Sequence, residues 1–118
     1  MSRAQTVKDY FSDLDSGEAD KAAAMFEPGG RVDAPWAAAI DPRAFVQQHI
    51  ESAPVRRHTI IDVLLSENGQ SAAVQFAYDA TDPSGAAKPT FVGCDHFTFG
   101  PGGGIKVLSI YVHQQPSP

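Results

Sequence analysis

The stretch Asp95-His96-Phe97-Thr98-Phe99 alternates between two sets of positions, which is the pattern of a β-strand. Asp95, Phe97 and Phe99 then lie on one face, because successive side chains of a strand point to opposite faces. A carboxyl group with aromatic rings on its own face is costly to ionise, since burial disfavours the charged form. We therefore expect Asp95 to stay protonated at neutral pH and to donate a hydrogen bond.

A second neutral donor, Tyr10, lies far upstream on the apolar face of a predicted helix. The apolar residues there recur at the spacing i, i+3, i+4 and i+7, which marks one helix face: Val7, Tyr10, Phe11 and Leu14. Two neutral donors that converge on one point would form an oxyanion hole, which stabilises a developing negative oxygen. Their spacing along the chain does not establish whether Tyr10 and Asp95 converge.

The rest of the chain predicts helices first and strands afterwards. A short second helix is expected at 18–26, and a third begins at Asp41-Pro42, with Asp as the N-cap and Pro at the first helical position. Strands are expected at 31–36, 58–66, 71–79, 89–99 and 105–113. This order indicates an α+β fold, in which a curved antiparallel sheet packs on three N-terminal helices. Such a cone, open at one end, would hold an apolar pocket.

Composition narrows the classes of function. The 118 residues predict a single domain, 1–118, with 42% hydrophobic and 19% charged residues and a net charge of −5. The only basic cluster, Arg56-Arg57-His58, is too small for a nucleic-acid footprint. One cysteine and the lack of a long apolar run predict a cytoplasmic chain with no membrane partner.

The order of elements, with Tyr10 in the first helix and Asp95 in an Asp-His-Phe-x-Phe strand, resembles the ketosteroid isomerases. More broadly it resembles the nuclear transport factor 2-like superfamily, which includes polyketide cyclases and epoxide hydrolases. The resemblance spans about Val7 to Val112. It implies an enzyme for a hydrophobic carbonyl substrate, a steroid or a polyketide, in which Tyr10 and protonated Asp95 stabilise a dienolate oxygen. It also implies a homodimer formed through the convex face of the sheet.

The proton-shuttling aspartate of that family has no direct match. It precedes a proline after the second helix, where this chain has Ala34 before Pro35 and Asp33 as the nearest carboxylate. Strand alternation points Asp33 away from the pocket, unless a bulge near Pro35 re-aims it. Asp33 and, as a substitute, His49 are therefore the candidate bases. A chain without a base would instead be a non-catalytic protein that binds hydrophobic small molecules.

The predicted substrate-binding residues lie on the faces of the predicted strands and helices that are assigned to the concave side. They are Trp36, Phe45, Val74, Phe76, Tyr78, Phe97, Ile110 and Val112. Trp36 is the first choice for the rim of the pocket. Cys94 and His96 lie on the opposite face and lack the partners that a metal site needs. No cofactor is expected, because no glycine-rich loop follows a strand and precedes a helix.

Overall fold

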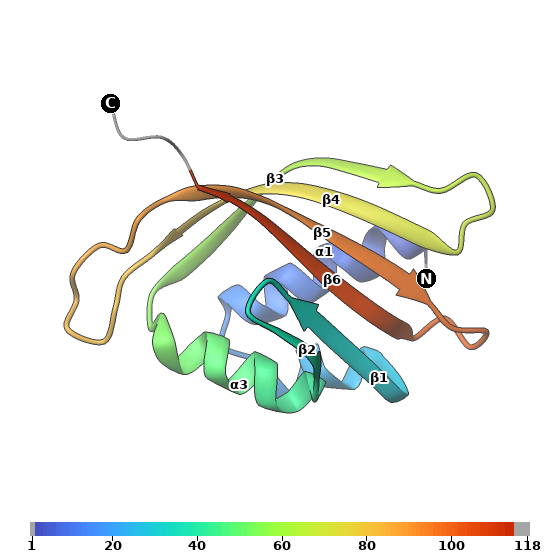
Figure 1. The fold of residues 1–118 in the computed structure, drawn as a ribbon, viewed down its shortest axis with the longest axis horizontal. Coiled ribbons are helices and arrows are strands. Elements are labelled where there is room, and N and C mark those ends of the chain that lie inside the picture. Colours follow the sequence, from blue (N-terminus) through green and yellow to red (C-terminus); the bar gives the residue numbers. More distant parts are fainter. Residues whose placement is uncertain (1, 115–118) are drawn as a thin grey trace.

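Six strands form one curved, open sheet, and the three helices lie against its concave side (Figure 1). The computed structural model describes residues 2–114. The helices are α1 (Arg3–Asp15), α2 (Ala19–Ala24) and α3 (Pro42–Ser52). The strands are β1 (Phe26–Ala34), β2 (Ala37–Ile40), β3 (Arg56–Leu65), β4 (Ser71–Ala80), β5 (Phe91–Phe99) and β6 (Ile105–Gln114), in the spatial order β2-β1-β6-β5-β4-β3. The predicted α+β class is confirmed.

Local signals in the sequence account for the helices. The Ser2 side chain caps α1 by accepting a hydrogen bond from the Gln5 backbone N–H at 3.0 Å. Asp41 caps α3 in the same way, accepting from Ala44 N at 3.1 Å, and Pro42 opens the helix as predicted. The apolar stripe of α1 is buried against the sheet, as its periodicity predicted.

The first strand differs from its prediction. β1 begins at Phe26 rather than Arg31, so the segment Pro28-Gly29-Gly30 lies inside the strand instead of ending the second helix. This segment coincides with a shift of register between Phe26 and Arg31 against β6, which glycines tolerate well. The four-residue strand β2 was not predicted, because so short a segment has no readable alternation.

The sheet is also mixed rather than wholly antiparallel. Within residues 2–114, β1 pairs with β6 in parallel, while the other neighbouring strands pair antiparallel as expected. Parallel pairing needs a long crossover between the strands, and here most of the chain lies between β1 and β6. Nothing in the local sequence pattern of either strand specifies that pairing.

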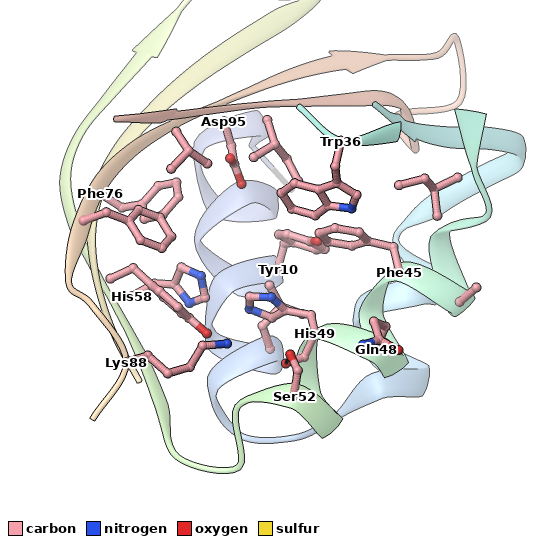
Figure 2. A pocket seen from close by; sticks show the side chains of 17 residues that line it. Tyr10, Trp36, Phe45, Gln48, His49, Ser52, His58, Phe76, Lys88 and Asp95 are labelled. Atoms are coloured by element: carbon pink, nitrogen blue, oxygen red, sulfur yellow. Dashed lines mark hydrogen bonds between the residues drawn. The ribbon is translucent and has the colours of Figure 1, made fainter. Parts of the chain in front are cut away.

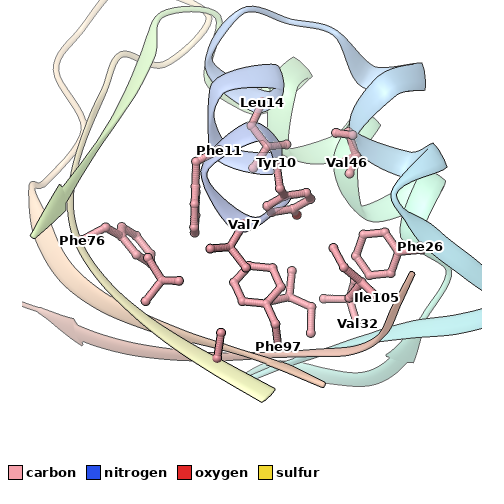
Figure 3. Packing of buried hydrophobic residues seen from close by; sticks show 14 of the residues in the cluster. Val7, Tyr10, Phe11, Leu14, Phe26, Val32, Val46, Phe76, Phe97 and Ile105 are labelled. Carbon is pink, nitrogen blue, oxygen red and sulfur yellow. The ribbon is translucent and has the colours of Figure 1, made fainter. Parts of the chain in front are cut away.

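The hydrophobic core lies between α1 and the middle strands (Figure 3). Phe97 on β5 packs edge-on against Tyr10, with ring centroids 5.6 Å apart, and against Phe11 at 6.0 Å. Val74 on β4 and Asp95 on β5 lie opposite each other across the two strands. Because Val74 belongs to the hydrophobic core, the core extends as far as Asp95 on the β4 side. In the described part of the chain, no helix is long and apolar enough to cross a membrane.

Candidate functional site

A cavity of about 660 Å³ opens beside this core, between α1, α3, the turn after β1 and the concave face of the sheet (Figure 2). Gly93, between Phe91 and Asp95 on the inward face of β5, leaves room for the ring of Phe76, which lines this cavity. The Phe76 ring occupies the space beside it. A Cβ atom at Gly93 would lie 2.7 Å from that ring, closer than real contacts allow.

The structure places most of the predicted substrate-binding residues on this cavity. Those that line it are Trp36, Phe45, Phe76, Tyr78, Ile110 and Val112. Trp36 lies in the turn between β1 and β2 and is 70% exposed, which puts it at the rim. Val74 and Phe97 do not line the cavity and are fully buried in the core. They share the inward face as predicted, but side chains of α1 cover that end of the sheet.

Tyr10 and Asp95 both line the cavity, from α1 and β5 respectively (Figure 2). Both side chains are buried, and neither the Tyr10 hydroxyl nor Asp95 Oδ1 has a hydrogen-bond partner among the described residues. Burial raises the pKa of Asp95 to about 8. Burial, and then the nearby charge of Asp95, raise the pKa of Tyr10 well above its usual value. At pH 7 both groups therefore hold their protons, and both can donate to a molecule in the cavity.

Asp33 lies elsewhere, on β1, the strand next to the edge strand β2. Its carboxylate accepts hydrogen bonds from the Ala39 backbone N–H at 2.8 Å and from Arg31 Nε at 3.2 Å. The Ala39 hydrogen bond, and then Arg31, lower the pKa of Asp33, so it is ionised and engaged. The register does shift between Val32 and Ala34, next to Pro35, but this irregularity does not bring Asp33 onto the cavity. The structure therefore gives Asp33 no access to a substrate there.

The cavity contains a histidine–carboxylate pair that sequence reasoning missed. His58 on β3 lines the cavity, and its Nδ1 lies 2.6 Å from Asp15 Oδ1 at the end of α1. The other carboxylate oxygen accepts the His58 backbone N–H at 2.8 Å, so both the ring and the backbone are held. A carboxylate at Nδ1 fixes the tautomer that carries its proton there, which leaves Nε2 as the basic nitrogen. Alternation along β3, where His58 pairs with Tyr78, is the one sequence signal that could have placed it.

Arg56 fixes the end of α1 that carries Asp15. The buried guanidinium donates from Nε to the Leu14 carbonyl at 2.5 Å and from one terminal nitrogen to the Ala53 carbonyl at 2.8 Å. It thereby joins the ends of α1 and α3 to the start of β3. The Leu14 carbonyl also accepts from the Gly17 backbone N–H at 3.1 Å, so Arg56 adds a second donor at this helix end while it holds Asp15 near His58.

His49 also lines the cavity, from α3, and its ring centroid lies 5.5 Å from that of His58. Burial, followed by the neighbouring His58 and Arg56, lowers the pKa of His49 to about 4. It is therefore neutral at pH 7, and its Nε2 has no hydrogen-bond partner within the described chain. A conjugate acid with so low a pKa makes His49 a weaker base than an ordinary histidine.

Two further observations concern other ligands. Among residues 2–114, no group of three or more His, Cys, Asp or Glu side chains is placed to hold a metal ion. On the convex face, Cys94 and Tyr111 line a shallower hollow of about 480 Å³. Burial, and then Asp95, raise the pKa of the Cys94 thiol, which lowers its reactivity at neutral pH.

Comparisons with known proteins agree with this architecture. Residues 7–108 match the family model of the SnoaL-like domain. A comparison with curated proteins finds no match. Among solved structures, the epoxide hydrolase/cyclase-like enzyme SalBIII, described in pyran ring formation in the polyether salinomycin, has a TM-score of 0.80 and 19% identity, over 94% of this chain and 90% of its own.

Two other solved structures are similar. A putative polyketide cyclase from Pseudomonas putida has a TM-score of 0.72 and 17% identity, over 96% of this chain and 92% of its own. A SnoaL-like polyketide cyclase from Agrobacterium tumefaciens has a TM-score of 0.78 and 10% identity, over 96% and 92%. At such identities these structures establish the fold alone. Because the family model covers most of the sequence, the chain belongs to the SnoaL-like domain family of the nuclear transport factor 2-like superfamily.

Proposed function

We propose that this chain is an enzyme that converts an apolar carbonyl compound to its enolate and guides the enolate to a rearranged or cyclised product. One observation carries the proposal: two neutral donors, Tyr10 and Asp95, are buried at the same cavity, and neither the Tyr10 hydroxyl nor Asp95 Oδ1 has a hydrogen-bond partner within residues 2–114. Donors held in place before the reaction stabilise an oxyanion at no cost of reorganisation. The largely apolar lining around them suits a substrate with a hydrophobic body.

His58 is our candidate for the base, in place of the Asp33 or His49 expected from the sequence. Its Nε2 takes the proton from the carbon next to the carbonyl, and the imidazolium that forms is stabilised by Asp15 at Nδ1. The electron pair of the broken C–H bond moves to the carbonyl oxygen, which accepts hydrogen bonds from Tyr10 and Asp95. His49 stays neutral and contributes a polar contact rather than a proton transfer.

The enolate has two productive outcomes in this site. Its carbon can attack a second carbonyl of the same molecule, which closes a ring and leaves an alkoxide that takes the proton back from His58. Alternatively, the proton returns to a different carbon, which shifts a double bond as in a ketosteroid isomerase. Similarity to proteins named as polyketide cyclases favours ring closure.

The test is proton exchange at carbon, which reports enolate formation whatever the later steps are. We would follow the exchange of the acidic protons of 2-tetralone in D₂O by NMR, and the isomerisation of a 3-oxo-Δ5 steroid by ultraviolet absorbance. Tyr10→Phe should slow both by about a hundredfold to a thousandfold, since it removes one oxyanion donor. Tyr111→Phe, at a tyrosine that is 62% exposed on β6, is the matched control and should have no effect.

Either of two results would reject the proposal. Equal rates for wild type and Tyr10→Phe would remove the oxyanion hole from the mechanism. Tight binding of these ketones without any exchange above the buffer rate would instead favour the non-catalytic binding protein.

The homodimer implied by the resemblance is also a proposal, with the convex face as its interface. Leu64 on β3 and Tyr111 on β6 are each 62% exposed on this chain, and both line the convex hollow. Exposed apolar side chains that gather on one face are typical of an interaction surface. Sedimentation equilibrium of wild type and Leu64→Glu tests this, because a charge at the interface should shift the mass toward the monomer.

A further inference from the structure

The cavity differs in character between its two ends. Asp95 and Trp36 lie at the end near the sheet, whereas Lys88 and Gln48 lie at the far end, on either side of His49 and Ser52 (Figure 2). Lys88 lies in the segment between β4 and β5, and of the lysines and arginines in the described part of the chain it alone lines the cavity. It is half-buried, and no carboxylate within residues 2–114 lies within ion-pair distance of its ammonium group.

The charge of Lys88 acts inside the cavity. It is one of the positive charges that lower the pKa of His49, after burial, His58 and Arg56. Arg56 on β3 acts on His49 in the same direction, and its hydrogen bonds go to backbone carbonyls rather than to a side-chain carboxylate. The carboxylate nearby, Asp15, is held by His58. The far end of the cavity therefore has an excess of positive charge, which attracts an anion.

A partly buried ammonium group without a partner favours a ligand group that is singly charged and can accept hydrogen bonds. A carboxylate, with one negative charge and two acceptor oxygens, meets that requirement. A phosphate would carry about two charges, which one lysine balances only in part.

We propose that Lys88 binds a carboxylate of the substrate, so that the enzyme acts on an apolar keto acid rather than on a neutral ketone. The acid group lies at the Lys88 end while the reacting carbonyl lies between Tyr10 and Asp95, and this orientation rests on the function proposed above. Lys88 thereby determines specificity and direction of binding. It takes no part in the proton transfer itself.

The test uses 6-hydroxy-2-naphthoate, which has a hydroxyl for the Tyr10–Asp95 end and a carboxylate for the Lys88 end. Its methyl ester and 2-naphthol, which lack the carboxylate, are the comparison ligands. Binding is measured by calorimetry at pH 7, where the carboxylate is ionised and Asp95 is protonated. Wild type should bind the acid about two- to fivefold more tightly than the ester, the range for a partly exposed charge pair. Lys88→Met should abolish that preference without weakening the ester. Lys106→Met, at an exposed lysine on β6, should leave it intact.

The results separate this inference from the proposed function. A wild type that binds the acid no more tightly than the ester, or binds neither, overturns the carboxylate site. A Lys88→Met variant that still prefers the acid over the ester as strongly as wild type also overturns the carboxylate site. Tyr10→Phe should weaken all three probes equally, because each presents its hydroxyl to the oxyanion end. If Tyr10→Phe changes none of them while Lys88→Met removes the preference, the carboxylate site stands and the oxyanion hole falls.

Discussion

The middle of the sheet and its β1–β2 edge each carry an aspartate on a strand, and the two are in opposite states. At the edge, Asp33 accepts hydrogen bonds from Ala39 and Arg31, and its pKa lies below the usual value. In the middle, Asp95 is buried beside aromatic rings, and its pKa rises to about 8. The same side chain is a structural anion in one region and a neutral donor in the other.

The hydrogen-bond donors around a carboxyl group, more than its position on a strand, therefore decide whether it is charged and what it can bind. A carboxylate that already accepts two hydrogen bonds is stable as an ion and has little to offer a ligand. A buried carboxyl without donors keeps its proton, and can give a hydrogen bond to an oxygen that becomes negative. The sheet gives Asp95 an apolar environment, because its neighbours across the strands are Val74 and Ile110.

The largest expected effect concerns activity. Asp95→Ala should slow proton exchange by about a hundredfold to a thousandfold, because it removes an oxyanion donor from the cavity. Asp33→Ala should leave the rate unchanged, since Asp33 does not line the cavity. NMR exchange rates on folded protein, with far-ultraviolet circular dichroism as the check of folding, measure both. Equal losses in the two variants would break the contrast between the two regions.

The next effect concerns stability against pH. The folded state raises the pKa of Asp95 to about 8, so between its unfolded value near 4 and pH 8 the folded state binds more protons. Stability must then fall as pH rises, by up to about 1.4 kcal/mol per pH unit from this group. Asp95→Asn, which never ionises, should remove that fall and be more stable than wild type at pH 7.5. Urea unfolding at pH 5 and pH 7.5 measures it, and parallel curves for the two proteins would contradict the raised pKa.

A smaller effect is expected from Gly93, beside Asp95 in the middle of the sheet. Gly93→Ala places a methyl group against the Phe76 ring and should lower the free energy of unfolding by about 1 to 3 kcal/mol, the usual cost of overpacking. Gly102→Ala is the control, because no atom lies within 4 Å of a Cβ atom there. Chemical denaturation measures both. Equal free energies of unfolding for the two variants would mean that the Phe76 ring moves aside at no cost and that this wall of the cavity adjusts to an added methyl group.

The smallest effect is expected at the edge. Ala39 has a positive φ of 55°, an unusual conformation for a residue other than glycine, and its N–H donates to Asp33. Asp33→Ala should therefore lower Tm slightly at pH 7. Because the pKa of Asp33 is lowered, its contribution is present above the unfolded pKa and is lost as the pH falls through the folded one. A thermal melt in acid should show no difference from wild type, and a constant difference would point to packing instead.

Local signals in the sequence predicted most of this fold. Apolar spacing predicted α1, and the Asp41 cap with Pro42 predicted the start of α3. The parallel pairing of β1 with β6 could not be predicted, because it depends on how distant segments pack rather than on either segment's own pattern.

The residues of the site also include some that the sequence predicted and some that it did not. Alternation in β5 and helical spacing in α1 selected Asp95 and Tyr10, and alternation in β1 correctly turned Asp33 away from the cavity. The pairing of His58 with Asp15 joins residues 43 positions apart and rests on the clamp that Arg56 makes between three elements. Neither residue stands out in its own segment, so only the assembled fold reveals the pair.

The two buried donors without partners also offer a route to the natural ligand that needs no assay of turnover. A compound whose oxygen reaches Tyr10 and Asp95 binds the folded chain but not the unfolded one, and so delays melting. The gain is about 2.7 kcal/mol when the compound is present at a hundred times its Kd. A library of carbonyl compounds could therefore be ranked by the rise in Tm that each produces. Compounds that bind at this site would raise the Tm of the Asp95→Ala variant less than that of wild type.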